Sequence, residues 1–232
     1  MHTIFHQFEL RFDPILDFPQ KIKTVLVPYA RIFPNINIVK ENSVGEQITF
    51  IADQEFYNLS IYWDKIILRY EGDPFNLVTA NSIIEDPFIE IFKKIRELDS
   101  FGNVTNVLFY TLFLNADSSN DLEKITESFK ENFLSTAIAE TVKDVNDIVV
   151  TFETENDEFL RRLDIKVYKG INDLINRKVS LNRIESLAAS EQKGSMIEFK
   201  FIDKSVTDFS FSDYKRITNI FKEEINKYEK YI

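Results

Sequence analysis

The hydrophobic pattern of this chain runs twice through the same order of predicted elements, and this repetition constrains the fold more than any single motif. Each half reads as a strand, a helix, an antiparallel strand meander and a second helix, with a seam near residues 100–103. Internal duplication is the simplest explanation of such a repeat. We therefore predict an α+β protein of two similar halves, residues 1–100 and 101–232, which form one compact unit with helices packed on one face of the sheet.

In the first half, alternation of apolar and polar residues predicts strands, and apolar spacing of three to four residues predicts helices. His6, Phe8, Leu10 and Phe12 alternate with polar residues, which is typical of a strand with one buried face. The predicted strands cover residues 4–12, 36–40, 47–52, 56–63 and 65–71, and the predicted helices cover about 18–32 and 84–98.

The second half repeats this order with one extra segment. Residues 104–114 are apolar on both faces, which is typical of a central strand. Further strands are expected at 147–153, 160–168 and 196–203, and helices after Ser119 or Asn120, in a short stretch to Val142, and from Ser210. Residues 170–194 break the symmetry, and there a short helix after Ser180 is favoured over a strand.

The predicted core is mostly aromatic and aliphatic. We expect burial of Phe8, Leu10, Phe12, Leu59, Ile61, Phe88, Phe92, Leu112, Phe129, Phe152, Ile165, Phe199 and Phe221.

Composition excludes several kinds of site. The 232 residues contain no cysteine, two histidines (His2 and His6) and five glycines. Disulfides, thiolate zinc sites, cysteine nucleophiles and most histidine-based metal or triad chemistry are therefore excluded, and no glycine-rich phosphate loop occurs. We expect no metal site and no cofactor. No apolar stretch is long enough to span a membrane and no secretory signal is visible, so we expect a cytoplasmic protein that does not contact membranes.

Charge is unevenly distributed in a chain of net charge −10. The middle is acidic, whereas residues 161–183 are basic and contain Arg161, Arg162 and Lys166. These three residues form a possible anion patch, although an internal neighbour for the acidic stretch is the favoured interpretation. The outward strand positions mix both signs, so we expect no net positive strip on the sheet and no binding of nucleic acid.

Polar residues of the predicted strands form a second candidate site. Glu9, Arg11 and Asp13 share one face of the first strand, and Arg69 and Glu71 are outward on another. Together they could bind a ligand or a partner. The favoured alternative is a row of cross-strand salt bridges on a solvated face.

The chain opens with Glu9-Leu10-Arg11-Phe12-Asp13-Pro14, and we expect a helix, a strand meander and a second strand at 106–114 to follow. It resembles an uncharacterised, sporadically distributed prokaryotic family whose members begin with a Glu-x-Arg-Phe-x-Pro strand. By layout the resemblance covers the whole chain, and it implies no catalytic residues. The tandem order of elements is also similar to the duplicated saddle of TATA-binding proteins, a likeness of topology that does not imply function.

We expect a protein-interaction or adaptor module without catalytic activity, either a monomer or a homodimer, whose partner is another protein. The alternative is a small-molecule-binding protein or a carboxylate-dependent enzyme that uses the polar sheet face. A deep pocket of carboxylates with Arg11 or Arg69 would favour the enzyme, and a shallow charged face would favour the binding module.

Overall fold

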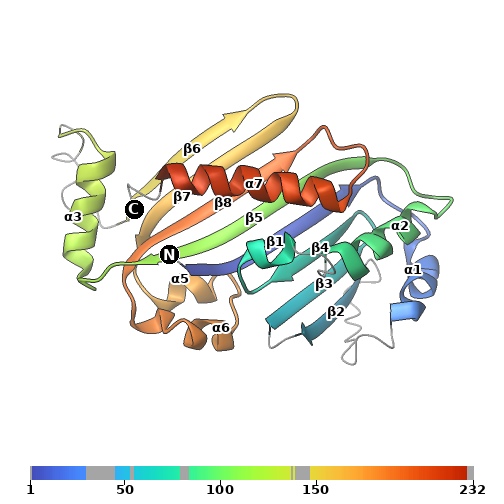
Figure 1. The fold of residues 1–232 in the computed structure, drawn as a ribbon, viewed down its shortest axis with the longest axis horizontal. Coiled ribbons are helices and arrows are strands. Elements are labelled where there is room, and N and C mark those ends of the chain that lie inside the picture. Colours follow the sequence, from blue (N-terminus) through green and yellow to red (C-terminus); the bar gives the residue numbers. More distant parts are fainter. Residues whose placement is uncertain are drawn as a thin grey trace.

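The computed structural model describes residues 2–29, 45–52, 55–78, 84–136, 138 and 147–228. The strands are β1 (His2–Phe12), β2 (Gly45–Ala52), β3 (Glu55–Tyr62), β4 (Lys65–Tyr70), β5 (Val104–Ala116), β6 (Val149–Glu155), β7 (Phe159–Tyr168) and β8 (Gly194–Asp203). They form one eight-stranded antiparallel sheet in the order β2-β3-β4-β1-β5-β8-β7-β6 (Figure 1). The predicted α+β class is therefore confirmed.

The strand predictions that fall on described residues are confirmed, with ends that differ by at most two residues. The strand predicted at 36–40 and most of the short helix predicted to end at Val142 lie outside the described residues. The central position predicted for residues 104–114 is also confirmed, because β5 lies between β1 and β8.

The helices are α1 (Phe18–Leu26), α2 (Glu90–Arg96), α3 (Leu122–Phe133), α5 (Ile171–Ile175), α6 (Leu181–Ser186) and α7 (Phe211–Tyr228). A turn of π-helix, Ile84–Ile89, leads into α2, and short 3₁₀ turns occupy Val27–Tyr29, Pro74–Val78 and Ala189–Glu191. The helix predicted after Ser180 is confirmed. The Ser180 hydroxyl oxygen accepts a hydrogen bond from the Arg183 N–H at 3.2 Å, which caps the start of α6.

The main core lies between the sheet and α7, which crosses in front of the strands in Figure 1. Phe221 of α7 is the centre of this packing. Its ring centroid lies 5.5 Å from Phe109, 5.1 Å from Phe113 and 4.8 Å from Phe199. Apolar residues of α1, α2 and α3 join the same cluster, so one core runs along most of this face of the sheet.

A second, smaller core lies on the opposite face, which corrects the prediction of helices on one face only. Leu174 of α5 and Ile184 of α6 form this cluster with Phe5, Leu112 and Met196 of the sheet. The cause is the extra segment between β7 and β8. Its apolar residues need a surface, and the apolar side chains on both faces of β5 provide one.

The predicted core residues are buried, with the exception of Phe152, whose side chain is 40% exposed. Phe152 belongs to β6, the last strand of the sheet. The alternating pattern predicted its strand correctly but contained no information on its position at the edge, where a side chain has a neighbouring strand on one side only.

Candidate functional site

The polar residues predicted as a site lie on the sheet face opposite α7, because side chains alternate along each strand. Leu10 of β1 enters the main core, so Glu9 and Arg11 point to the other face. The same alternation on β4 places Arg69 on that face, and Glu71 follows directly after the strand. The part of this face that lies outside the α5–α6 cluster we call the open face.

Glu9 and Arg11 form an ion pair with each other. The Arg11 guanidinium donates hydrogen bonds to Glu9 at 2.9 and 2.7 Å, and the Gln7 amide donates to the same carboxylate at 2.7 Å. Asp13 is used elsewhere, since it accepts hydrogen bonds from the backbone N–H and side chain of Asn103 at 2.8 and 3.2 Å. Asp13 therefore fixes the turn before β5 and does not join the other two residues.

Arg69 and Glu71 hold the α5–α6 segment on the sheet. The Arg69 guanidinium donates to the carbonyl oxygens of Arg177 and Lys178, each at 3.0 Å, and lies 3.9 Å from the centre of the Phe5 ring. Burial lowers the pKa of Arg69. The buried Glu71 carboxylate accepts from the N–H of Ser180 at 3.0 Å and from its hydroxyl. These two residues of the predicted site are thus occupied by contacts within the chain.

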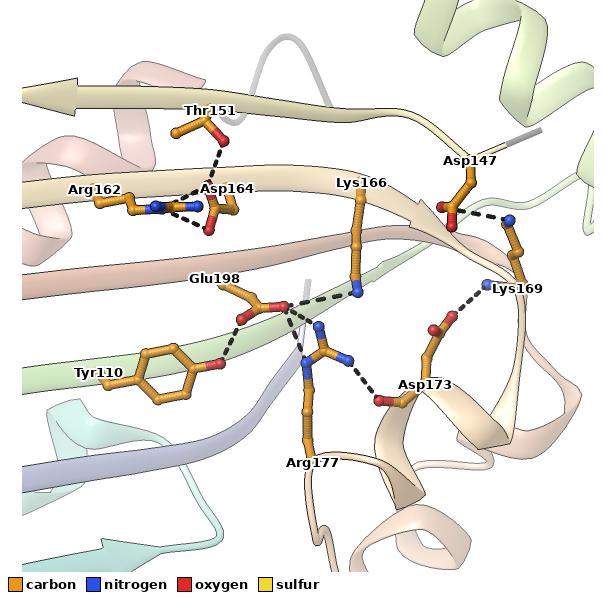
Figure 2. A network of polar contacts seen from close by, with 10 residues as sticks. All are labelled: Tyr110, Asp147, Thr151, Arg162, Asp164, Lys166, Lys169, Asp173, Arg177 and Glu198. Atoms are coloured by element: carbon orange, nitrogen blue, oxygen red, sulfur yellow. Dashed lines mark hydrogen bonds and ion pairs between the residues drawn. The ribbon is translucent and has the colours of Figure 1, made fainter. Parts of the chain in front are cut away.

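Glu198 of β8 is the centre of a polar cluster at the boundary of the open face (Figure 2). Its carboxylate accepts hydrogen bonds from the Tyr110 hydroxyl at 2.7 Å and from Nε of Arg177 at 3.0 Å, and Lys166 Nζ lies 3.8 Å away. Burial and the neighbouring Glu198 raise the pKa of Tyr110. Burial disfavours the charged form of Arg177, but its hydrogen bonds to Glu198 outweigh this effect and raise its pKa.

The predicted anion patch is divided between the two faces of the sheet. Arg162 points to the open face, where its guanidinium binds Asp164 at 2.9–3.0 Å and lies 3.6 Å from Glu153. Hydrogen bonding to Asp164 raises the pKa of Arg162. Lys166 shares this face, whereas Arg161 points to the α7 side and pairs with Glu224 at 2.8 Å. Adjacent residues of a strand point in opposite directions, so these three do not form one patch.

Sequence reasoning missed the combination of Tyr110, Arg177 and Glu198. Glu198 and Tyr110 stand at alternating outward positions and were detectable as polar residues of a sheet face. Arg177 lies in a turn after α5, and its approach to Glu198 depends on how the segment folds back over the sheet. No local pattern carries that information.

The larger cavities lie away from the predicted polar residues of β1 and β4, which are Glu9, Arg11, Asp13, Arg69 and Glu71. A volume of about 420 Å³ opens between α1 and α2, and two others, of about 360 and 380 Å³, open between α7 and the β6–β7 hairpin. Arg161 lines both cavities beside α7, while Arg11 and Arg69 line none of the three.

Over the described residues, no group of three or more histidine, aspartate or glutamate side chains is arranged to hold a metal ion. In the same part of the chain, no helix is both long enough and apolar enough to cross a membrane. Comparison with known families found no matching family model, and comparison with curated proteins found no similar sequence.

Proposed function

We propose that this chain is a non-catalytic protein-interaction module whose partner binds the open face of the sheet. One observation carries the proposal: each carboxylate that β1 and β4–β8 direct to the face opposite α7 already has a partner within the chain. The carboxylates are Glu9, Glu153, Glu155, Asp164 and Glu198. A carboxylate held by arginine or lysine is a poor general base or nucleophile, because the cation stabilises its negative charge and so weakens its tendency to accept a proton or to attack a substrate.

Two cations of this face, in contrast, retain donors for a partner. Lys200 makes no hydrogen bond or ion pair within the described residues, and the Arg162 side chain is 44% exposed although it is paired. On a protein of net charge −10, a local excess of donors orients an acidic partner, since the rest of the surface repels it. The alternative of a small-molecule enzyme is less supported, because the described cavities contain neither Arg11 nor Arg69.

We also propose that the two halves arose by duplication. The strand order supports this: β2-β3-β4-β1 in the first half is mirrored by β6-β7-β8-β5 in the second, and the halves meet at β1 and β5. An experimental structure in which β1–β4 cannot be superposed on β5–β8 in this correspondence would contradict the duplication.

The interaction proposal is tested by site-specific photo-crosslinking in the native host. A benzophenone amino acid replaces either Lys200, on the open face, or Lys215, an exposed residue of α7 on the other face. We expect a defined protein adduct from position 200 and none from position 215, and weaker capture when the neighbouring Arg162 is changed to Glu. Adducts confined to position 215, or a catalytic turnover that Glu198→Gln abolishes, would contradict the proposal.

A further inference from the structure

Four aliphatic side chains form a row across the open face. The strand register places Ile67 opposite Glu9, Glu9 opposite Leu108, Leu108 opposite Ile202 and Ile202 opposite Leu160. Ile67, Ile202 and Leu160 are partly exposed, and Leu108 is 7% exposed. None of the four belongs to either core cluster. We call these four residues the aliphatic stripe.

Basic and neutral residues flank the aliphatic stripe on both sides. The row on one side consists of Arg69, Gln7, Tyr110, Lys200 and Arg162. The row on the other side consists of Lys65, Arg11 and Asn106, with Lys204 just beyond the end of β8. From β4 to β8 these two rows contain no acid. Glu158, just before β7, lies opposite Lys204, whose side chain pairs with Glu155. Glu9, which lies between Ile67 and Leu108, pairs with Arg11.

This arrangement bears on the expectation that the face carries no net positive strip. The outward positions of the strands do mix both signs, but the register sorts them along the strand direction. Glu198 and Asp164 lie opposite each other, one row further towards α5, and Glu71 lies at the same end of its strand. The sequence lists the residues of a face but not which of them stand side by side.

The dimensions of the aliphatic stripe match an α-helix that crosses the strands. Neighbouring strands lie about 4.8 Å apart, so the four steps from β4 to β7 span about 19 Å. A helix with a rise of 1.5 Å per residue covers that length in about 13 residues, and its pitch of about 5.4 Å is close to the strand spacing. One apolar side chain per helical turn can therefore meet one position of the stripe per strand.

On this basis, which rests on the proposed function, we propose that the partner presents an acidic amphipathic α-helix that lies across the strands on the aliphatic stripe. Its apolar side chains contact Leu108, Ile202 and Leu160. Carboxylates on both sides of that apolar row pair with the flanking cations, Lys200 above all. This mode resembles the binding of an amphipathic helix in a groove, except that the helix lies on a sheet face, and the charge pairs fix the orientation of the helix.

A short helix fits this surface better than double-stranded DNA. The basic rows end after about 19 Å, and the chain as a whole carries a charge of −10. A duplex carries one charge per about 1.7 Å and would extend beyond the basic rows over acidic surface. A helix of about 13 residues ends where the basic rows end.

The test uses fluorescence anisotropy with the full chain and a labelled helical peptide of about 16 residues, which carries one leucine per turn and glutamates on both sides of the leucine row. A control peptide has the same composition with its leucines spread around the helix. We expect saturable binding of the first peptide and at least about tenfold weaker binding of the control.

Lys200→Glu and Lys65→Glu should each weaken peptide binding about tenfold, one on each side of the aliphatic stripe. Lys215→Glu on α7 is the matched control and should change binding less than about twofold. Circular dichroism verifies that each variant is folded. Equal binding of the two peptides, or tighter binding of a 12-base-pair duplex than of the helical peptide, would overturn the inference.

The crosslinking experiment distinguishes failure of the helix inference from failure of the proposed function. A crosslinked protein at position 200 together with no peptide binding would reject the helix and leave the interaction surface standing. Adducts confined to position 215 would reject the interaction surface itself.

Discussion

At the scale of single residues, the most unusual environment is that of His6 in the main core. Its side chain is fully buried, and Nδ1 lies 2.9 Å from the Thr111 hydroxyl. The groups that face it from other elements are Tyr70, Phe109 and Tyr214, and none of them carries a charge near neutral pH. Burial therefore dominates and lowers the pKa of His6 to about 3.

This burial makes folding sensitive to acid. The pKa of histidine in the unfolded chain is about 6.5, so below that pH protons bind preferentially to the unfolded state. The stability that the neutral His6 provides is present above pH 6.5 and is lost as the pH falls, by about 1.4 kcal/mol per pH unit down to the folded pKa near 3. Urea unfolding between pH 7 and 5 measures this slope.

His6→Phe combined with Thr111→Val removes both the titrating ring and the hydroxyl that it binds. Between pH 6.5 and pH 5, the free energy of unfolding should fall by about 2 kcal/mol less in this double variant than in the parent chain. His2→Gln, which changes the exposed histidine, is the control and should leave the slope unchanged. The same pH dependence in parent and double variant would show that His6 is not the responsible group.

At the scale of elements, sequence periodicity predicted the positions of strands in the sequence more reliably than it predicted which elements pack against them. The alternation of residues 4–12 predicted β1, and the apolar run of residues 104–114 predicted β5. Burial on one face of a strand produces alternation in the sequence, and burial on both faces produces an apolar run. The edge position of Phe152 and the docking of α5 and α6 on the far face could not be predicted in this way. Both depend on which strands become neighbours, a property of the whole chain.

The candidate site was predictable to the same extent. Alternation correctly placed Glu9 and Arg11 on one face, but they pair with each other along β1 and do not form the cross-strand salt bridge that the pattern favoured. The contacts of Arg69 and Glu71 with residues 177–180 join positions more than 100 residues apart. Only the tertiary fold brings these residues together.

The docked α5–α6 segment provides the prediction at this scale. Ser180→Ala removes the hydroxyl that caps α6 and donates to the buried Glu71, a loss of about 1–2 kcal/mol. We expect amide hydrogen exchange in residues 171–186 to become about tenfold faster, with little change in β5, since the main core does not include this segment. Ser186→Ala, at an exposed position of the same helix, is the control. Equal acceleration throughout β5 would contradict a local role for Ser180.

At the scale of the whole molecule, one core joins both halves of the chain. Tyr214 of α7 lies 5.3 Å from Phe8, and Phe221 of the same helix lies 6.0 Å from Phe75. A helix from the second half thus covers strands and turns of the first, and β1 pairs directly with β5. The seam near residues 100–103 is a boundary in the sequence pattern and not in the packing.

The overall charge leads to the last prediction, which concerns nucleic acid. The chain has a net charge of −10, and Arg161 faces Glu224 on the α7 side, so the basic cluster of the sequence cannot act as one surface. We expect no measurable duplex binding in a gel-shift assay at physiological salt, because too few cations remain to release the counterions of DNA. Arg161→Ala and Arg162→Ala form a matched pair, adjacent in sequence and on opposite faces. Micromolar binding that weakens steeply with added salt, and that Arg162→Ala with Lys166→Ala abolishes while Arg161→Ala does not, would show that the open face binds DNA.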